Sequence, residues 1–168
     1  GRDACCESHR TANRVGMRTK GTMLVGHSES SEERVDHMLR ARALQDETGG
    51  FEAFIPLACH PDNNQMRKLP APTASDTLRV HAVARLMCDN MARGKAFGIA
   101  TGVEVAQTAV WFGVDDLDGT VQEEKIYHMA GARTPELMTT RQLAKLVRAA
   151  GREPVERDTL YNVVHAPA

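Results

Sequence analysis

Acidic side chains are concentrated in one short stretch of the sequence, DDLDGTVQEEKIYHMAG, which runs from Asp115 to Gly131. Its five carboxylates and its histidine are Asp115, Asp116, Asp118, Glu123, Glu124 and His128. Carboxylates accept hydrogen bonds from hydroxyl groups, and a nearby imidazole can transfer a proton. Such a dense set of like charges is typical either of a ligand site or of a solvated turn before a helix. For Asp118, which precedes a Gly-Thr step, we favour a role in a site.

Other polar residues follow predicted strands elsewhere in the chain. They are His27, Glu29, Cys59, His60 and Thr101. His27 comes directly after Gly26, which allows the backbone to approach a ligand closely. We therefore favour a site role for the imidazoles of His27 and His60. Adjacent strand residues point to opposite faces, so we predict that Cys59 is a small buried thiol rather than the partner of His60 in a nucleophile pair.

The elements that would position these residues alternate between short apolar runs and amphipathic helices. The predicted strands are residues 22–26, 51–58, 95–101 and 115–121. The predicted helices begin at Ser30, Ser75, Val103 and Thr139, and glycines 49, 113 and 151 end the first, third and fourth. The second helix is predicted to bury Leu78, Val83, Leu86 and Met87. Strands that alternate with helices through short connections indicate βα units around a parallel sheet.

Four βα units are half of a (β/α)8 barrel, whose active site is built from the loops at the carboxyl ends of its strands. A complete barrel typically takes about 250 residues, and this chain has 168. We therefore predict an α/β fold in which residues 1–168 form the C-terminal half of a TIM-type barrel, with parallel strands alternating with helices. The N-terminal half of the barrel would be a missing partner, and the polar residues at the strand ends would meet at one mouth.

The composition is typical of a globular domain and has no bias toward one charge. Apolar residues make up 42% of the chain, and 21 Lys and Arg compare with 22 Asp and Glu. No apolar run approaches the ~20 residues of a membrane span. We therefore expect a soluble, cytoplasmic protein without a membrane partner. Balanced charge does not attract a phosphate backbone, so we expect a small-molecule substrate and no nucleic acid.

From the residues alone, three classes of function remain. A metal-dependent hydrolase would use His27, His60 and Asp118 as ligands. A nucleotide-binding barrel would hold a nucleotide-like molecule in the same mouth, and a catalytically silent scaffold would do neither. The four cysteines are Cys5, Cys6, Cys59 and Cys88. Because they lack the spacing of a zinc knuckle and the density of a disulfide framework, we predict reduced thiols and no metal ligand among them.

The segment TMLVGHSE, residues 22–29, resembles a strand motif of radical S-adenosylmethionine (SAM) enzymes. Leu24, Gly26 and Glu29 match the apolar residue, the glycine and the glutamate that approach the adenosyl group in those enzymes. Three further segments share the resemblance: ERVDHMLRARALQDETGGFEAFIPLACHP, RLMCDN and FGVDDLDGTVQEEKIYHMAGARTP. Together, from about Ser8 to Val164, the sequence resembles the menaquinone-pathway radical SAM family.

Two segments are specific within that family. IPLACHP and DDLDGTVQEEKIYHMAG resemble the aminofutalosine synthases, whereas LQDETGGF is shared with the dehypoxanthine futalosine cyclases, which are the alternative. The resemblance implies a [4Fe-4S] cluster and SAM, which is consumed as a substrate. It also implies that the 5'-deoxyadenosyl radical adds to the enolpyruvyl double bond of 3-[(1-carboxyvinyl)oxy]benzoate. Aryl migration with loss of the carboxylate would then give aminofutalosine.

The resemblance and the strand-end positions together suggest roles for individual residues. The SAM-binding residues would be Leu24, Gly26, His27 and Glu29. The catalytic residues would be His60, Asp118 and His128. The substrate-binding residues would be Thr101, Gly119, Thr120 and Glu124. Ribosyl hydroxyls need acceptors, and proton transfers must accompany the rearrangement, so acids and histidines suit this chemistry.

One feature of the family is missing from the sequence. The family holds its cluster with a C-x3-C-x2-C motif after the first strand, and the four cysteines of this chain do not have that spacing. We therefore expect the cluster ligands in an N-terminal half that is absent from this chain, or a protein that has lost the chemistry. In either case the chain alone is expected to be inactive.

Overall fold

The computed structural model describes residues 2–119, 124–135 and 137–165. The first six elements are α1 (Arg2–Arg14), β1 (Thr19–Val25), α2 (Ser31–Thr48), β2 (Phe51–Ala58), α3 (Ala74–Met87) and β3 (Arg93–Gly94). The next six are α4 (Gly98–Thr101), α5 (Val103–Ala109), α6 (Ile126–Met129), α7 (Thr140–Ala149), β4 (Glu156–Arg157) and β5 (Val163–His165). Within these described ranges, no helix is both long enough and apolar enough to cross a membrane.

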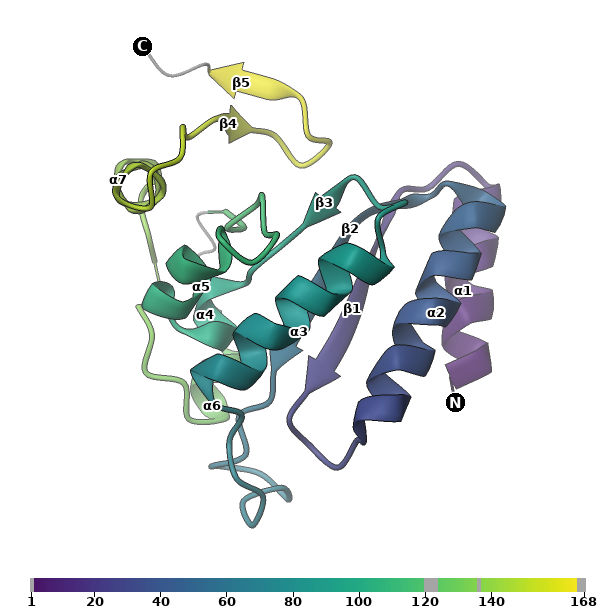
Figure 1. The fold of residues 1–168 in the computed structure, drawn as a ribbon, viewed down its shortest axis with the longest axis horizontal. Helices are drawn as coiled ribbons and strands as arrows, with labels where there is room; N and C mark the ends of the chain where they lie inside the picture. The colour runs from purple at the N-terminus through teal and green to yellow at the C-terminus, as the bar shows by residue number, and fades with distance from the viewer. Residues whose placement is uncertain (1, 120–123, 136, 166–168) are drawn as a thin grey trace.

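Three parallel strands form the central sheet, and their order in it, β1-β2-β3, is their order in the chain. A parallel bridge between Lys95 and Asp116 extends the sheet by one further position. Helices α1, α2, α3 and α5 pack on one side of the sheet, with α1 against α2, α2 against α3 and α3 against α5 (Figure 1). This arrangement consists of successive βα units, and it confirms the predicted α/β class with a parallel sheet.

The two faces of the sheet differ in what covers them. Gly21, Met23 and Val25 of β1 are buried against the helices. Thr22 and Leu24 alternate with them along the strand, and Leu24 is 40% exposed on the other face. At this edge of the sheet, an apolar side chain of β1 is therefore open on the face away from the helices.

The main core lies between the sheet and helices α1 to α3. Its buried residues are Met23, Val25, Met38, Ala41, Leu44, Phe51, Phe54, Val80, Ala84, Cys88 and Met91. A second core packs α5 beside β3 and consists of Ala96, Ala106, Ala109 and Val114. Burial of apolar surface contributes about 25 cal/mol per Å², so these two cores hold the sheet and the helix layer together.

Two helices begin and one ends as the capping rules predict. Ser30 and Glu33 form a capping box at the start of α2, and Gly49 ends that helix in the left-handed conformation with φ 59°. Thr139 and Gln142 form the same kind of box before α7. These predictions are confirmed because each depends only on residues within one helical turn.

The start and the buried face of α3 differ from the prediction. The cap is Thr73 and not Ser75: the Thr73 hydroxyl accepts the Asp76 N–H at 3.1 Å, and the Asp76 carboxylate accepts the Thr73 N–H at 3.3 Å. The prediction that Leu86 is buried is also wrong, because this side chain is 79% exposed. The buried stripe of α3 consists of Thr77, Val80, His81 and Ala84.

The predicted strand at residues 95–101 is wrong. β3 ends before it, at Gly94, and the short helix α4 occupies its second half. The N–H groups of Ala100 and Thr101 both donate to the Phe97 carbonyl at 3.0 Å, which turns the chain out of the sheet. A short apolar run does not by itself distinguish a strand from a buried helical turn.

The last predicted strand, residues 115–121, is reduced to the bridge at Asp116, and its residues 120 and 121 lie outside the described residues. The sequence reasoning missed α1 and the antiparallel hairpin of β4 and β5. The hairpin lies at the end of the molecule opposite α6 (Figure 1). It returns residues near the C-terminus to the sheet, where they contact the residues that follow β3.

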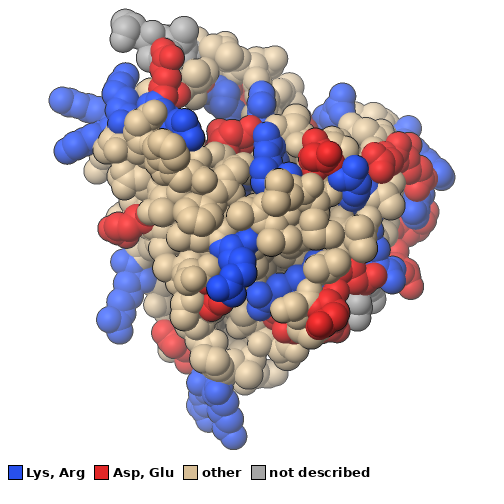
Figure 2. Space-filling view, in the orientation of Figure 1, with Lys and Arg blue, Asp and Glu red and all other residues tan. Residues whose placement is uncertain are grey.

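Positive and negative side chains are mixed on the surface. Over α1 and α2, at the right of Figure 2, Lys and Arg lie beside Asp and Glu. Examples are the ion pairs between Arg10 and Glu47 at 2.9 Å and between Arg40 and Asp36 at 2.8 Å. Exposed pairs of this kind contribute little to stability. They do, however, neutralise this part of the surface.

Candidate functional site

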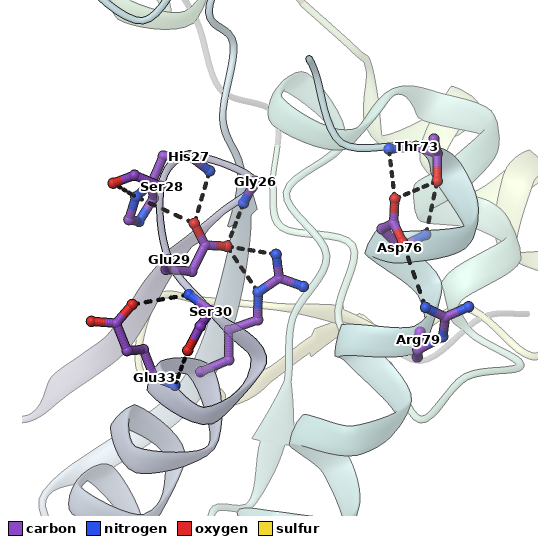
Figure 3. Close-up of polar contacts among 10 residues, drawn as sticks. Gly26, His27, Ser28, Glu29, Ser30, Glu33, Thr73, Asp76 and Arg79 are labelled. Atoms are coloured by element: carbon purple, nitrogen blue, oxygen red, sulfur yellow. Dashed lines mark hydrogen bonds and ion pairs between the residues drawn. The ribbon is translucent and has the colours of Figure 1, made fainter. Parts of the chain in front are cut away.

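The turn after β1 is closed by the carboxylate of Glu29 (Figure 3). Its Oε1 accepts the Gly26 N–H at 2.6 Å, and its Oε2 accepts the His27 N–H at 2.8 Å. Arg34 of α2 donates its Nε to Oε1 at 2.8 Å. Only 9% of the Glu29 side chain is exposed. Glu29 therefore holds together the turn in which Gly26 has φ 88°.

The charge of Glu29 is stabilised within this turn. Burial by itself raises the pKa of the carboxyl group, but hydrogen bonds from Gly26, His27 and Arg34 outweigh burial and hold the pKa below its ordinary value. Both carboxylate oxygens thus have partners in the turn and in α2. Through these hydrogen bonds, Glu29 fixes the conformation of the turn after β1.

Two other residues of the predicted SAM-binding set present accessible side chains. Leu24 is exposed on the open face of the sheet, and 27% of the His27 side chain is exposed. The His27 Nδ1 lies 3.2 Å from Glu29 Oε2, which orients the ring. An apolar side chain and an imidazole are therefore both accessible at the carboxyl end of β1.

His60, which follows β2, is oriented by two contacts. Its Nε2 lies 2.8 Å from the Ala100 carbonyl, and its ring packs edge-on against Tyr127 with the ring centroids 5.5 Å apart. A carbonyl oxygen only accepts, so Nε2 carries the proton of this hydrogen bond. In the neutral ring, Nδ1 is then an acceptor. The contacts with Ala100 and Tyr127 join the end of β2 to α4 and α6.

His128 has a different environment. Its Nδ1 lies 2.6 Å from the Glu124 carbonyl, and its Nε2 lies 2.8 Å from the Thr134 carbonyl. The Glu124 carboxylate accepts the Tyr127 N–H at 2.8 Å and lies 3.6 Å from His128 Nδ1. Both ring nitrogens therefore contact backbone carbonyls. His128, predicted to be catalytic, and Glu124, predicted to bind substrate, contact each other and hold together the segment from residue 124 to residue 134.

A buried cation holds the acidic stretch against the sheet. The ammonium group of Lys95 lies 2.9 Å from Asp118 Oδ1 and 3.6 Å from Asp116 Oδ2, and 3% of the Lys95 side chain is exposed. The Asp118 N–H donates to Asp116 Oδ1 at 2.8 Å. Asp118 has φ 64°, a left-handed conformation that is uncommon for a residue with a side chain.

The C-terminal hairpin completes this cluster. Arg157 of β4 donates to Asp116 Oδ2 at 2.7 Å, and the Arg157 guanidinium lies over the Tyr161 ring at 4.6 Å. Burial by itself raises the pKa of Asp116, but the charges of Lys95 and Arg157 outweigh it and lower the pKa. Asp116 is therefore ionised and bridges the sheet to the hairpin.

The other three predicted substrate-binding residues, Thr101, Gly119 and Thr120, are not seen to form a cluster among the described residues. The Thr101 hydroxyl donates to the Phe97 carbonyl at 3.1 Å. Thr120 lies outside the described residues. Gly119 and Asp118 border a largely apolar cavity of about 30 Å³ between α4, α5 and α7. A cavity of this size has room for about two water molecules and is far smaller than a ligand pocket of about 300 Å³ or more.

The described residues do not support the metal-dependent hydrolase hypothesis. His27, His60 and Asp118 are all described, and no group of three or more potential ligands that could hold a metal ion is found in that part of the chain. Among the cysteines, Cys59 and Cys88 are buried, whereas Cys5 and Cys6 lie on α1. Burial raises the pKa of Cys88 to about 11, which keeps that thiol protonated.

Comparison with known proteins assigns this arrangement to a family. Residues 48–168 match the family model described as the CofH/MqnC C-terminal region. The chain belongs to this family. The match includes His60, the acidic stretch and the C-terminal hairpin. Together with the relatives named next, it confirms the resemblance to the family of the aminofutalosine synthases.

Relatives in the family carry specific names. Aminodeoxyfutalosine synthase of Thermus thermophilus is 52% identical over 162 residues, 94% of this chain and 44% of that protein. The synthase of Streptomyces coelicolor is 43% identical over 167 residues, 93% of this chain and 43% of that protein. Cyclic dehypoxanthine futalosine synthase of Streptomyces coelicolor is 38% identical over 156 residues, 92% of this chain and 39% of that protein. The chain thus spans less than half of the length of these relatives.

Several residues of the candidate site were missed by the sequence reasoning. They are Arg34, Lys95, Tyr127, Arg157 and Tyr161. Lys95 lies in an apolar run that was interpreted as a plain strand, although a lysine in such a run signals a buried partner. Arg157 and Tyr161 belong to the C-terminal hairpin, which brings them to the site. The sequence reasoning did not recognise a pattern for this hairpin.

Proposed function

We propose that the chain is the C-terminal part of a radical SAM barrel that makes aminofutalosine (6-amino-6-deoxyfutalosine). The order of the strands supports the barrel. Sequential parallel strands covered on one side by helices, as β1 to β3 are by α1, α2, α3 and α5, continue naturally into a closed (β/α)8 barrel, whereas a doubly wound sheet has helices on both faces. The open face of β1, with Leu24 exposed, would then lie in the barrel interior.

The proposed substrates are SAM and 3-[(1-carboxyvinyl)oxy]benzoate. The single observation that carries this proposal is the 52% identity with aminodeoxyfutalosine synthase over 94% of this chain. The 38% identity with the cyclic dehypoxanthine futalosine synthase is lower, so the synthase reaction is the better supported of the two. Because the chain covers only 44% of the synthase, the N-terminal part of a complete protein would supply the rest of the site.

The turn after β1 fits the adenosyl group of SAM. Leu24 offers an accessible apolar surface to a purine ring, and Gly26 turns the backbone beside it with φ 88°. Glu29 and Arg34 hold the turn in place. His27 is accessible at the rim, where its imidazole can contact a ribosyl hydroxyl.

Asp118 and His60 are the proposed acid-base groups. Asp118 contacts Lys95 through Oδ1 at 2.9 Å, and 26% of its side chain is exposed, so Oδ2 can accept a hydrogen bond from a substrate hydroxyl. His60 holds Ala100 through Nε2 and keeps Nδ1 for proton transfer during the rearrangement. We assign proton transfer to His60 rather than to His128, because both nitrogens of His128 contact backbone carbonyls.

The [4Fe-4S] cluster implied by the family does not fit the residues described here. Three thiolates with a common orientation would be required, and no suitable group of ligands is found among the described residues. Cluster ligands would therefore belong to the N-terminal part of a complete protein. The residues of this chain would bind SAM and substrate, orient them and move protons.

The proposal is tested by assaying a complete protein that contains residues 1–168 and an N-terminal part with the cluster motif. We expect SAM and 3-[(1-carboxyvinyl)oxy]benzoate to be converted to aminofutalosine, detected by mass spectrometry. Dehypoxanthine futalosine is the control substrate. Turnover of dehypoxanthine futalosine alone would replace the synthase reaction with that of the cyclase, and absence of both products would refute the proposed function.

A further inference from the structure

We infer that Lys95 is a positioning residue that fixes the Asp118 carboxylate as an acceptor for a substrate hydroxyl, and that the C-terminal hairpin supports it. This inference rests on the proposed function, because it deepens the role assigned to Asp118. The evidence comes from burial, distances and backbone conformation in the cluster formed by Lys95, Asp116, Asp118, Arg157 and Tyr161. We call this set the Lys95 cluster.

The sheet register determines where the Lys95 side chain points. Phe54 pairs with Gly94, and Phe54 packs into the core on the helix side. Because side chains alternate along a strand, Arg93 and Lys95 lie on the opposite face with Ala53. That is the face on which Leu24 is exposed. Lys95 therefore projects from the face that would line the interior of a barrel.

A buried lysine needs a compensating charge, and Lys95 has two. Asp118 lies 2.9 Å away and Asp116 lies 3.6 Å away. Removing an ammonium group from water costs several kcal/mol unless such partners are present. Lys95 is consequently held between two carboxylates, and each carboxylate is oriented by the same ammonium group.

Asp118 has a left-handed backbone conformation that contacts with its neighbours hold in place. Its φ is 64°, a value that aspartate tolerates better than most residues but adopts less often than right-handed values. Two contacts hold this conformation: Lys95 binds Oδ1, and Asp116 accepts the Asp118 N–H at 2.8 Å. The second carboxylate oxygen of Asp118 is thereby aimed in a fixed direction.

The hairpin fixes the far side of the Lys95 cluster. Arg157 binds Asp116 at 2.7 Å. The Tyr161 ring lies beneath the cations of Arg157, Lys95 and Arg93, at 4.6, 5.9 and 5.6 Å. Attraction between a cation and an aromatic face favours this packing. The hairpin of β4 and β5 is thus part of the support for Asp118 through its contacts with Asp116 and Lys95.

The test compares Lys95→Met, Asp118→Asn and the double variant in the complete protein. We expect each single variant to lower kcat for aminofutalosine formation about 10²-fold, the order typical of a mispositioned acid-base group. If Lys95 acts through Asp118, the double variant loses about as much as either single variant, not about 10⁴-fold. Multiplicative losses would overturn the inference.

Two variants and one structural measurement complete the design. Lys95→Arg keeps the positive charge and should recover part of the lost kcat, which also covers a failure of Lys95→Met to fold. Lys20→Met is the matched control on the same face of the sheet, since Lys20 lies on β1 and pairs with Ala53 of β2, away from the Lys95 cluster. In protein without substrate, Lys95→Met should speed hydrogen exchange of the Asp118 amide about 10-fold, and Lys20→Met should not.

The outcomes separate this inference from the proposed function. A wild-type protein that makes no aminofutalosine refutes the proposed function, whereas the exchange result still reports whether Lys95 holds Asp118. A wild-type protein that is active, with Lys95→Met at full kcat, refutes the positioning role alone. The positioning role would also be refuted if Lys95→Met lost thermal stability but kept the wild-type kcat per folded molecule.

Discussion

Gly26 lies directly against the ring of Pro72, so that a Cβ atom placed on Gly26 would be 2.7 Å from the Pro72 Cβ and Cγ atoms. Gly26 also has φ 88°, a conformation that side chains rarely allow. The turn after β1 therefore packs against the segment that leads into α3. Only glycine satisfies both the contact and the backbone angle.

Gly26→Ala should destabilise the protein because it adds a clash to an unfavourable backbone conformation. Strain at such a position is of order 1 to 3 kcal/mol, so we expect a loss of about 3 kcal/mol, measured by urea denaturation. Gly49→Ala is the matched control: Gly49 has φ 59°, but no atom lies within 4 Å of its added Cβ. It should lose only about 1 kcal/mol. Equal losses would show that the Pro72 contact is unimportant.

His81 should make the stability depend on pH. This side chain is 3% exposed, and burial lowers its pKa from 6.5 to about 4. The unfolded chain therefore binds the proton more readily than the folded chain. Stability is fully present above pH 6.5 and is lost as the pH falls toward 4, by roughly 3 kcal/mol for a shift of this size.

The measurement is the free energy of unfolding of the wild type and of His81→Leu between pH 7 and pH 4. The difference in unfolding free energy between the wild type and His81→Leu should change by roughly 3 kcal/mol between pH 7 and pH 4. Glu29 and Asp116 have lowered pKa values, so their contributions are lost only at more acidic pH, as the pH falls through the folded pKa of each group. A constant difference between the proteins would contradict a neutral, buried His81.

Much of the fold could be predicted because its signals are local. The capping boxes at Ser30 and Thr139 and the left-handed Gly49 each depend on a few neighbouring residues, and all are present. The strand predicted at residues 95–101 is wrong because the course of the chain there does not depend on local residues alone. Their apolar composition suits a strand, but the turn at Phe97 takes them out of the sheet, and local composition does not encode that change of direction.

The candidate site could be predicted only in part. Strand ends and family motifs indicated Asp118, His60 and Glu29 as candidates, and their roles stay predictions. Their partners come from distant segments: Lys95 is 23 residues from Asp118 in sequence, and Arg157 is 41 residues from Asp116. Contacts over such separations depend on tertiary packing. A sequence pattern does not contain them.

Iron-sulfur reconstitution should fail with this chain and succeed with a complete protein that carries the cluster motif. The reason is that Cys88 is buried in the core under the helices and Cys59 is buried just after β2, while Cys5 and Cys6 lie on α1. Anaerobic reconstitution followed by EPR and iron analysis measures the result. A stoichiometric [4Fe-4S] signal from residues 1–168 that responds to SAM would overturn the assignment of the ligands to an N-terminal part.

His60 and His128 should respond differently to the same substitution in a complete, active protein. In His60→Gln, the side-chain amide can still donate to the Ala100 carbonyl, so the fold should persist, but the basic Nδ1 is lost. We expect kcat to fall about 10²-fold or more, with little change in Tm. In His128→Gln, one of two contacts to backbone carbonyls is lost. Tm should therefore fall, while kcat per folded molecule stays near that of the wild type. Measuring kcat, its pH profile and Tm for both variants separates proton transfer from structural support.

The opposite result would exchange the two assignments. It would be a lower kcat at unchanged Tm in His128→Gln, together with a wild-type kcat in His60→Gln.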